Sequence, residues 1–391
     1  MPYLVVSFCA NNSYSFSFLT RPLFKTIMRV PENLTTGTPN SMEYSKLGSS
    51  QIPVSRICLG SMTWGLQNTQ QQADQQIEYA LSQGINFIDT AEMYAVPPSP
   101  DTYGKTEAII GNWLSRNPQR RQELIIASKI AGPGLPWVRD GGPITGEAVF
   151  AAVDTSLKRL QTDYIDLYQL HWPNRTTPHF GKHFPNHIRF SDIDRKQHEA
   201  EMLEILQALA SCIKAGKIRH VGLSDDSTWG INTYLKLSEK HDLPRMVSIQ
   251  NEFSLLHAKD WPYLIENCVH EDVAYLPWSP LAAGMLSGKY IDGARPEGSR
   301  WTYMQRKGIF RDTESANEAV KGYVEVANAH GFTPSQLALA WCNQVDGVTS
   351  TIIGATTMEQ LKENVAAFSK PLSEEILTDI NTVFKRYPAP Y

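Results

Sequence analysis

Three separated apolar runs of the sequence are followed by four titratable side chains, at or shortly after the end of each run. The run FID ends at Asp89, and the phenol of Tyr94 follows five residues later. Two later runs, IIASK and IDLYQLH, end at Lys129 and His171. A carboxylate at the end of a core strand is costly to desolvate unless it is paired, so a cation is expected beside Asp89. Asp89 and Tyr94 alone could also be a capping acid and a surface tyrosine, but the later cation and imidazole favour one shared site.

These four side chains are suited to moving a proton to or from an oxygen atom. If Lys129 lies against Asp89, both buried charges are tolerated, and the ammonium also lowers the pKa of Tyr94 from about 10 by favouring the phenolate. Such a tyrosine can give a proton to a substrate oxygen or remove one, while His171 bonds and orients the same oxygen. Protonation of a carbonyl oxygen helps only when a nucleophile reaches the carbon, and no Ser, Cys or Thr nucleophile accompanies the four. A hydride from a nicotinamide cofactor is therefore the expected partner.

Lys129 also allows a second interpretation, a Schiff-base aldolase, in which a lysine at the end of a barrel strand attacks the carbonyl carbon. Such a lysine has to be neutral and free, whereas an adjacent Asp89 raises its pKa. Proton transfer is therefore the favoured hypothesis and the aldolase is the alternative.

The elements that have to position these residues alternate between strand and helix from residue 43 onward. Strands are expected at 56–59, 86–89, 124–128, 165–170, 218–223, 246–250, 273–277 and 350–353. Helices are expected at 70–83, 104–116, 145–160, 198–214, 229–240, 260–269, 315–345, 357–368 and 373–385, and the longest is interrupted at Gly331 to Pro334. Residues 44–55 read as a turn-rich lead-in, and 172–197 as a long polar insertion.

Eight strands that are each followed by a helix predict a parallel sheet with right-handed crossovers. The fold class expected for residues 42–391 is α/β, a single-domain (β/α)8 TIM barrel with loop insertions. The carboxyl ends of its strands would face one another, so the four titratable residues would converge on one site. A doubly wound sheet is the alternative fold, but no G-x-G-x-x-G follows the first strand.

Composition sets further limits on the class of protein. The chain of 391 residues is 42% hydrophobic and 19% charged, which is typical of a globular enzyme-sized protein. Its net charge of -4 and the absence of a long apolar run predict neither a nucleic-acid partner nor a membrane span. Five scattered cysteines without a C-x-x-C motif indicate a reduced compartment, and a cytoplasmic location is expected.

A metal site is not expected. His179, His183 and His187 are spaced four residues apart, as zinc ligands on a helix would be. Gly181 and Pro185 interrupt any helix there, which favours a solvated loop.

Residues 1–41 differ from the rest of the chain, being rich in Ser and Phe and carrying Arg21, Lys25 and Arg29 against the single acid Glu32. A transit peptide, and thus organellar import, has this composition, but so does a start upstream of Met42. We expect a disordered or dispensable extension.

The segments FIDTAEMY, IIASKI and LYQLHWP, at these spacings, resemble the aldo-keto reductase superfamily, and most closely its Tas-like NADP(H)-dependent members. Potassium-channel β subunits are relatives of the same group. The likeness runs from about Met42 to the last residues and includes LGSMTWG, SLKRLQTDYIDLYQLHWP, WSPLAAGMLSGKY and IIGATTMEQLKEN. The resemblance implies that the family's catalytic tetrad falls on Asp89, Tyr94, Lys129 and His171.

The resemblance also implies an NADPH site. The residues that it assigns to the nicotinamide end are Ser61, Met62, Thr63, Asp89, Ser224, Asp225, Gln250 and Trp278. Those that it assigns to the pyrophosphate and the 2′-phosphate are Ser279, Leu281, Gly284, Lys289 and Arg300. Those that it assigns to the adenosine end are Gly354, Thr356, Gln360, Glu363 and Asn364. Gly354 and Thr356 stand just before an expected helix, where free backbone N–H groups attract phosphate.

One position departs from the family pattern. The family usually has Asn after the Ser of the fifth strand, where this chain has Ser224-Asp225. An Asn can accept a hydrogen bond from the NH₂ of a nicotinamide carboxamide and donate one to its carbonyl, whereas an ionised Asp225 can only accept. Its negative charge should also slightly favour the oxidised ring.

The sequence thus predicts an NADPH-dependent reductase of aldehyde or ketone carbonyls with a small-molecule substrate. The alternative is a cofactor-sensing regulatory subunit with little turnover, as the likeness to channel β subunits permits. Those subunits commonly lack the catalytic histidine, so His171 favours an enzyme. The identity of the substrate depends on loops such as 172–197 and 290–312, and an oligomer is compatible with the sequence.

Overall fold

The computed structural model describes residues 42–192, 194–303 and 309–391. The predicted extension 1–41 lies outside the described residues. None of the helices in the described ranges combines the length and the apolar character that a membrane crossing requires.

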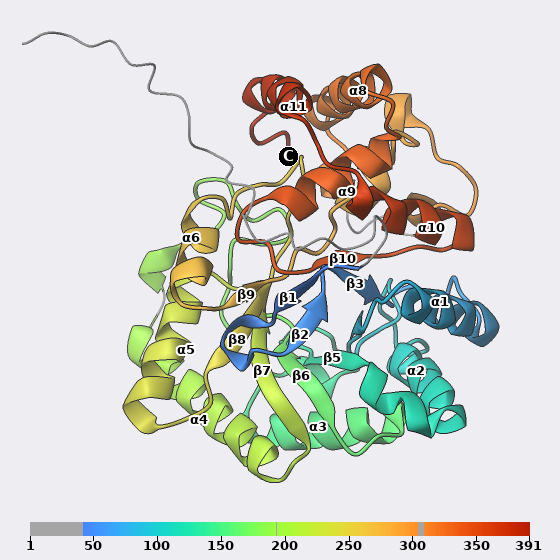
Figure 1. Cartoon of the computed structure of the whole chain (residues 1–391). Helices are drawn as coiled ribbons and strands as arrows, with labels where there is room; N and C mark the ends of the chain where they lie inside the picture. Colours follow the sequence, from blue (N-terminus) through green and yellow to red (C-terminus); the bar gives the residue numbers. More distant parts are fainter. Residues whose placement is uncertain (1–41, 193, 304–308) are drawn as a thin grey trace, which may run out of the picture. The chain divides into compact units, whose positions relative to one another are not determined.

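The described strands include eight that form one sheet in which all neighbours are parallel. They are β3 (Ile57–Gly60), β4 (Phe87–Asp89), β5 (Ile125–Ile130), β6 (Ile165–Leu170), β7 (Ile218–Ser224), β8 (Met246–Gln250), β9 (Ala274–Tyr275) and β10 (Thr351–Ile353). Their order is β10-β3-β4-β5-β6-β7-β8-β9, which leaves β9 and β10 at the two edges. Backbone N–H groups of Thr349 and Ile352 donate to the carbonyls of Tyr275 and Pro277, 2.9 Å each, and join those edges. The predicted (β/α)8 barrel is confirmed (Figure 1).

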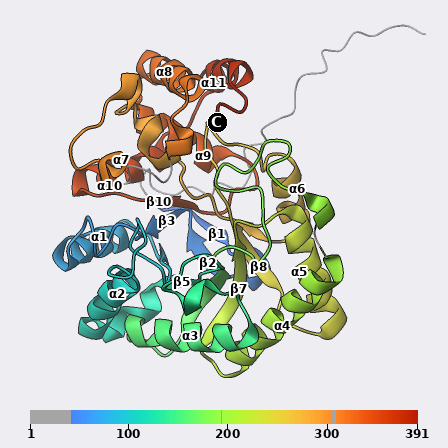
Figure 2. The same ribbon diagram turned by 180° about the vertical axis from the view of Figure 1, so that it is seen from behind.

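Helices follow one another around the outside of the strands (Figure 1; seen from behind in Figure 2). Those that connect or follow the barrel strands are α1 (Gln70–Ser82), α2 (Lys105–Arg116), α3 (Gly146–Leu160), α4 (Arg195–Lys214), α5 (Thr228–His241), α6 (Tyr263–His270), α9 (Pro334–Gln344) and α10 (Met358–Ala366). Three more are α7 (Arg300–Tyr303), α8 (Glu314–Ala329) and α11 (Glu374–Arg386). Because helices cover the outer face and side chains fill the interior, every residue of β6 and β8 is buried.

Most of these helices begin after a Ser or Thr whose hydroxyl accepts a hydrogen bond from a backbone N–H of the first turn. These N-caps are Thr69, Thr145, Ser227, Thr313, Thr333, Thr357 and Ser373. One of these N-caps lies at the break predicted at Gly331 to Pro334. There Thr333 caps α9, and Pro334 occupies the first position of the helix. The long predicted helix is therefore two helices.

The lead-in before the barrel contains regular structure that the sequence did not predict. β1 (Tyr44–Lys46) and β2 (Pro53–Ser55) pair antiparallel. Leu47 and Val54 of this hairpin are fully buried and pack with the inward-facing Phe87 of the barrel. The hairpin therefore covers the amino-terminal end of the barrel interior. Strands of three residues are too short to show an alternating pattern, which explains the missed prediction.

Gly48 in this hairpin provides a test of the packing. Its φ is +50°, and a Cβ there would lie 2.3 Å from the carbonyl oxygen of Val247 and 2.7 Å from that of Asp272. We predict that Gly48→Ala lowers the free energy of unfolding by about 2–4 kcal/mol, as measured by urea denaturation. Gly216→Ala is the matched control, because Gly216 has a φ of +74° but nothing within 4 Å of the added Cβ. It should cost about 1 kcal/mol. If Gly48→Ala and Gly216→Ala lost the same free energy of unfolding, backbone strain and not close packing of the hairpin would explain the loss at Gly48.

Candidate active site

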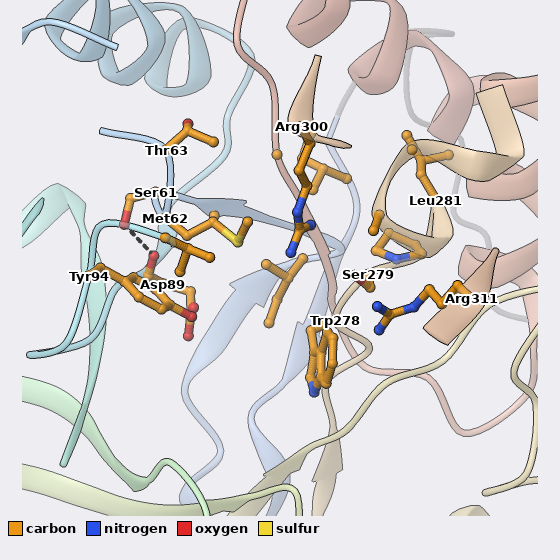
Figure 3. A pocket seen from close by; sticks show the side chains of 18 of the residues that line it. Ser61, Met62, Thr63, Asp89, Tyr94, Trp278, Ser279, Leu281, Arg300 and Arg311 are labelled. Carbon is orange, nitrogen blue, oxygen red and sulfur yellow. Dashed lines mark hydrogen bonds between the residues drawn. The ribbon is translucent and has the colours of Figure 1, made fainter. Parts of the chain in front are cut away.

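A cavity of about 1460 Å³ opens at the carboxyl ends of the barrel strands. Tyr94 and His171 line it, together with every residue that the sequence assigned to the cofactor. Lys129 is the exception, because its side chain is fully buried behind Asp89. Figure 3 shows Asp89 and Tyr94 on one side of the cavity and Trp278 and Arg300 across from them. The structure therefore brings the predicted residues together around one cavity.

A buried ion pair lies at the base of this site. Lys129 Nζ donates to Asp89 Oδ2 at 2.6 Å and to the Thr90 carbonyl at 2.8 Å. Gln250 Nε2 donates to the other carboxylate oxygen, Asp89 Oδ1, at 2.8 Å. Asp89 ends β4 and Lys129 lies in the neighbouring β5, so two adjacent strands place the pair. The predicted contact between the carboxylate and the ammonium is present.

The charge of Lys129 follows from this contact. Burial disfavours the ammonium, but its electrostatic interactions and hydrogen bonds with Asp89 and Tyr94 together outweigh that effect, so the pKa of Lys129 is raised. A lysine held as a cation cannot attack a carbonyl carbon, which disfavours the aldolase interpretation.

Tyr94 presents its hydroxyl beside this ammonium. Lys129 Nζ lies 3.5 Å from Tyr94 Oη and 5.0 Å from the ring centroid. The prediction that Lys129 lowers the pKa of Tyr94 is wrong in its net direction. Burial raises the pKa of Tyr94 above its ordinary value, and the opposing effect of Lys129 is smaller. At neutral pH the side chain is therefore a phenol that has a proton to give.

His171 stands next to Tyr94, with the two ring centroids 5.6 Å apart and the rings edge to face. Its backbone N–H donates to the Ile130 carbonyl at 2.9 Å, and its ring also packs on Trp172. Burial, followed by the charge of Lys129, holds the pKa of His171 well below its ordinary value. The imidazole is therefore neutral, and its buried Nδ1 has no hydrogen-bond partner within the described residues. A neutral ring can bond an oxygen atom placed between it and Tyr94 without adding charge.

Two of the residues assigned to the nicotinamide end are tied to Asp89. The Ser61 hydroxyl donates to the Asp89 carbonyl at 2.7 Å, as the dashed line in Figure 3 shows. The Gln250 amide donates to the Asp89 carboxylate. The strand ends on that side of the cavity therefore form one connected hydrogen-bonded network.

Asp225 follows β7 and is almost fully buried. Trp278 Nε1 donates to its Oδ1 at 3.0 Å, and His179 Nδ1 lies 3.6 Å from the same oxygen. Burial raises the pKa of Asp225 to about 7, against the effects of His179 and Trp278. Near neutral pH the ionised acceptor that the sequence predicted is therefore only one of two forms, and the acid form can also donate.

The predicted phosphate-binding residues lie along the cavity wall. Lys289 and Arg300 both line it, and Gly284, with a φ of +96°, lies against the Lys289 side chain. Burial, followed by repulsion from Arg311, lowers the pKa of Arg300 to about 10, which still leaves a cation. Two basic side chains, both half-buried in the cavity wall, suit an anionic group.

At the adenosine end one expectation is wrong. The backbone N–H of Thr356 is not free, because it donates to Gln360 Oε1 at 3.0 Å. Asn364 Nδ2 likewise donates to the Gly354 carbonyl at 3.1 Å. The amide side chains of α10 therefore order this turn.

The two insertions contribute cavity residues that the sequence did not single out. Trp172, Phe180 and Arg311 all line the cavity. Arg311 donates through Nε and Nη2 to Glu252 Oε1 at 2.8 and 2.6 Å, and the Tyr391 hydroxyl bonds the same oxygen at 3.0 Å. Trp172 could have been suspected because it follows His171, but no sequence signal marks Phe180 or Arg311.

The insertion 172–197 is anchored to the residues after β7. Arg175 forms an ion pair with Asp226, and the Thr177 hydroxyl donates to the Asp225 carbonyl at 2.8 Å.

The ring nitrogens of His179, His183 and His187 each contact a different backbone carbonyl. Across the described ranges, no group of three His, Cys, Asp or Glu side chains is placed to hold a metal ion.

Comparison with known proteins identifies relatives of the whole barrel. Residues 56–385 match the model of the aldo/keto reductase family. The chain is 44% identical over 354 residues to the protein Tas of Escherichia coli strain K12, which covers 89% of this chain and all of that protein. It is 30% identical over 347 residues to the uncharacterised oxidoreductase YrpG of Bacillus subtilis strain 168, covering 88% of this chain and 96% of that protein.

The contribution of the Asp89–Lys129 ion pair to folding can be tested by measuring the free energy of unfolding of variants. We predict that Lys129→Met lowers the free energy of unfolding by about 3–5 kcal/mol, because it leaves a buried carboxylate without its cation. Asp89→Asn combined with Lys129→Met should recover at least about half of that loss. Lys217→Met, which breaks the exposed pair with Asp154, is the control and should cost less than about 1 kcal/mol. A double variant as unstable as Lys129→Met would contradict the argument. Denaturant titration measures all three.

Proposed function

We propose that this chain, which belongs to the aldo/keto reductase family, uses NADPH to reduce the carbonyl group of an aldehyde or ketone to an alcohol. The observation that carries the proposal is the position of the Tyr94 hydroxyl. It lies 3.5 Å from the buried Lys129 ammonium at the wall of a cavity, and the ring that carries it packs edge to face with the neutral imidazole of His171. These groups fit the transfer of one proton to an oxygen atom.

The cavity also fits a nicotinamide dinucleotide. It extends from Tyr94 to Asn364, and a Cβ added at Gly354 would meet nothing within 4 Å. Lys289 and Arg300 supply positive charge for a phosphate partway along it. The cofactor, when bound, supplies the hydride that reaches the carbonyl carbon.

The residues of the chain then supply the proton. The phenol of Tyr94 donates to the carbonyl oxygen, and its O–H bond breaks as the new O–H bond forms. The resulting phenolate is stabilised by the Lys129 ammonium at 3.5 Å, which Asp89 keeps in place. His171 orients the same oxygen through a hydrogen bond. Burial of Tyr94 favours the neutral phenol, which is the form that reduction requires.

A substrate screen tests the proposal directly. Purified protein is mixed with NADPH and a panel of aldehydes and ketones, and the loss of NADPH absorbance is followed. Turnover on at least one carbonyl is expected. Tight NADPH binding without turnover on any of them would favour the alternative, a cofactor-sensing regulatory subunit.

Removal of one oxygen atom tests the role of Tyr94. We predict that Tyr94→Phe lowers the rate of carbonyl reduction by about 10²–10⁴-fold, because the proton donor is lost. NADPH affinity, measured by fluorescence titration, should change little. A rate within a few-fold of the unmodified protein would exclude Tyr94 as the donor.

Cofactor choice tests Lys289 and Arg300. Neutral replacements at both positions should weaken NADPH binding by about 2–4 kcal/mol through loss of charge-assisted hydrogen bonds to the 2′-phosphate. NADH, which lacks that phosphate, should bind almost as before. Lys236→Gln with Lys240→Gln, two exposed positions on α5, removes the same charge outside the cavity and serves as the control. Equal losses for NADPH and NADH would show that Lys289 and Arg300 do not select the phosphate.

A further inference from the structure

Asp225 is a buried acid in the cavity wall with two polar contacts from other segments. Trp278 Nε1 donates to its Oδ1, and His179 Nδ1 from the insertion faces the same oxygen at 3.6 Å. The other ring nitrogen of His179 lies 3.3 Å from the Asp226 carbonyl, which fixes the orientation of the ring. His179 Nδ1 is itself buried and has no hydrogen-bond partner within the described residues. An acid and an imidazole therefore face one another in a setting with little water.

The backbone at this position accepts an amide equally well. Asp225 has a φ of +49°, in the left-handed region where Asp and Asn are the most frequent residues after Gly. Asp225→Asn therefore changes the charge of the site while the local backbone conformation can be kept. The substitution isolates the effect of the carboxylate.

The charge matters because the oxidised and reduced nicotinamide rings differ by one positive charge. This step rests on the proposed function, since it takes the cavity wall beside Trp278 as the place of the ring. An ionised carboxylate in a buried wall interacts much more strongly with a nearby cation than it would in water. The neutral acid gives no such attraction.

We propose that Asp225 and His179 form an acid–imidazole pair that couples the protonation of this site to the oxidation state of the bound cofactor. With Asp225 ionised, the site prefers NADP⁺. With a proton on Asp225, that preference is lost and the acid can donate to the carboxamide as an Asn would.

The surroundings of Asp225 determine where the proton is gained. The polar and titratable groups that face it from other segments are His179, Trp278, Glu252, Asp260 and Tyr94. Burial raises the pKa of Asp225 to about 7, and Glu252 and Asp260 add to the rise, whereas His179 and Trp278 oppose it. The carboxylate is therefore mostly protonated below about pH 7 and mostly ionised above it.

The sign of the pH effect follows by linkage. A cationic ring favours the ionised acid, so the pKa of Asp225 is lower in the NADP⁺ complex than in the NADPH complex. The ratio of the NADPH to the NADP⁺ dissociation constant should therefore rise with pH. It rises about tenfold for each unit by which the pKa differs between the two complexes.

The experiment measures both dissociation constants by titration of the full chain between about pH 6 and pH 8.5. Both cofactors carry the same 2′-phosphate, so titration of that phosphate cancels in the ratio. We expect the ratio to rise about tenfold over this range. In Asp225→Asn it should be nearly constant. In His179→Gln the rise should move to higher pH, because the group that opposes protonation of Asp225 is gone.

Each other outcome has a distinct meaning. A constant ratio in the unmodified protein would overturn the inference while leaving the proposed function intact. A rise of equal size in Asp225→Asn would also overturn it, because another group would then be responsible. If neither cofactor binds at any pH, the proposed function fails, and the inference fails with it. The thermal midpoint of each variant, measured without cofactor, verifies that the barrel is folded.

Discussion

The contact between Lys129 and Asp89 is the interaction on which the rest of the site depends. Two charges without access to water are tolerated only when their remaining hydrogen-bonding positions are filled. Here the Thr90 carbonyl accepts from the ammonium, and the Gln250 amide donates to the carboxylate. The pair therefore connects the ends of several strands through hydrogen bonds. Its ammonium is fixed 3.5 Å from the Tyr94 hydroxyl, which no flexible surface lysine could achieve.

Burial disfavours the charged form of every titratable group in the site, and at three of them no partner outweighs it. It raises the pKa of Tyr94, lowers that of His171 and raises that of Asp225. Around the Lys129–Asp89 pair, Tyr94 and His171 are therefore neutral at pH 7, and Asp225 is close to the midpoint of its titration. In the proposed reduction, negative charge develops on the Tyr94 oxygen as the proton moves, and the fixed ammonium is already in place to stabilise it. The proposal therefore needs no permanently ionised tyrosine.

The barrel and the grouping of Asp89, Tyr94, Lys129 and His171 could be predicted because each depends on a local pattern. Apolar runs and caps mark the strands and helices, and a parallel barrel places every strand end at one side. The pKa of Tyr94 could not be predicted, since it is the difference between burial and an opposing charge, and burial is known only from the fold. The Thr356 N–H was expected to be free, but it donates to the side chain of Gln360 four residues later. Arg311 was missed because its partners Glu252 and Tyr391 are far from it in sequence.

The two sides of the cavity differ in how they are built. Strand ends form the side that carries Asp89 and Gln250, and the register of the parallel strands together with the hydrogen bonds to Asp89 fixes it. The opposite side combines Asp225 and Trp278, which follow β7 and β9, with residues of the insertion 172–197, which is held by contacts such as Arg175 with Asp226. The insertion 172–197 carries both His179, which lies beside Asp225, and the aromatic Phe180, whose ring lies near that of Trp278. Sequence change in this insertion therefore acts on the surroundings of Asp225 and of Trp278 together. Through Trp172, which packs on His171, it also reaches the group of side chains at the strand ends.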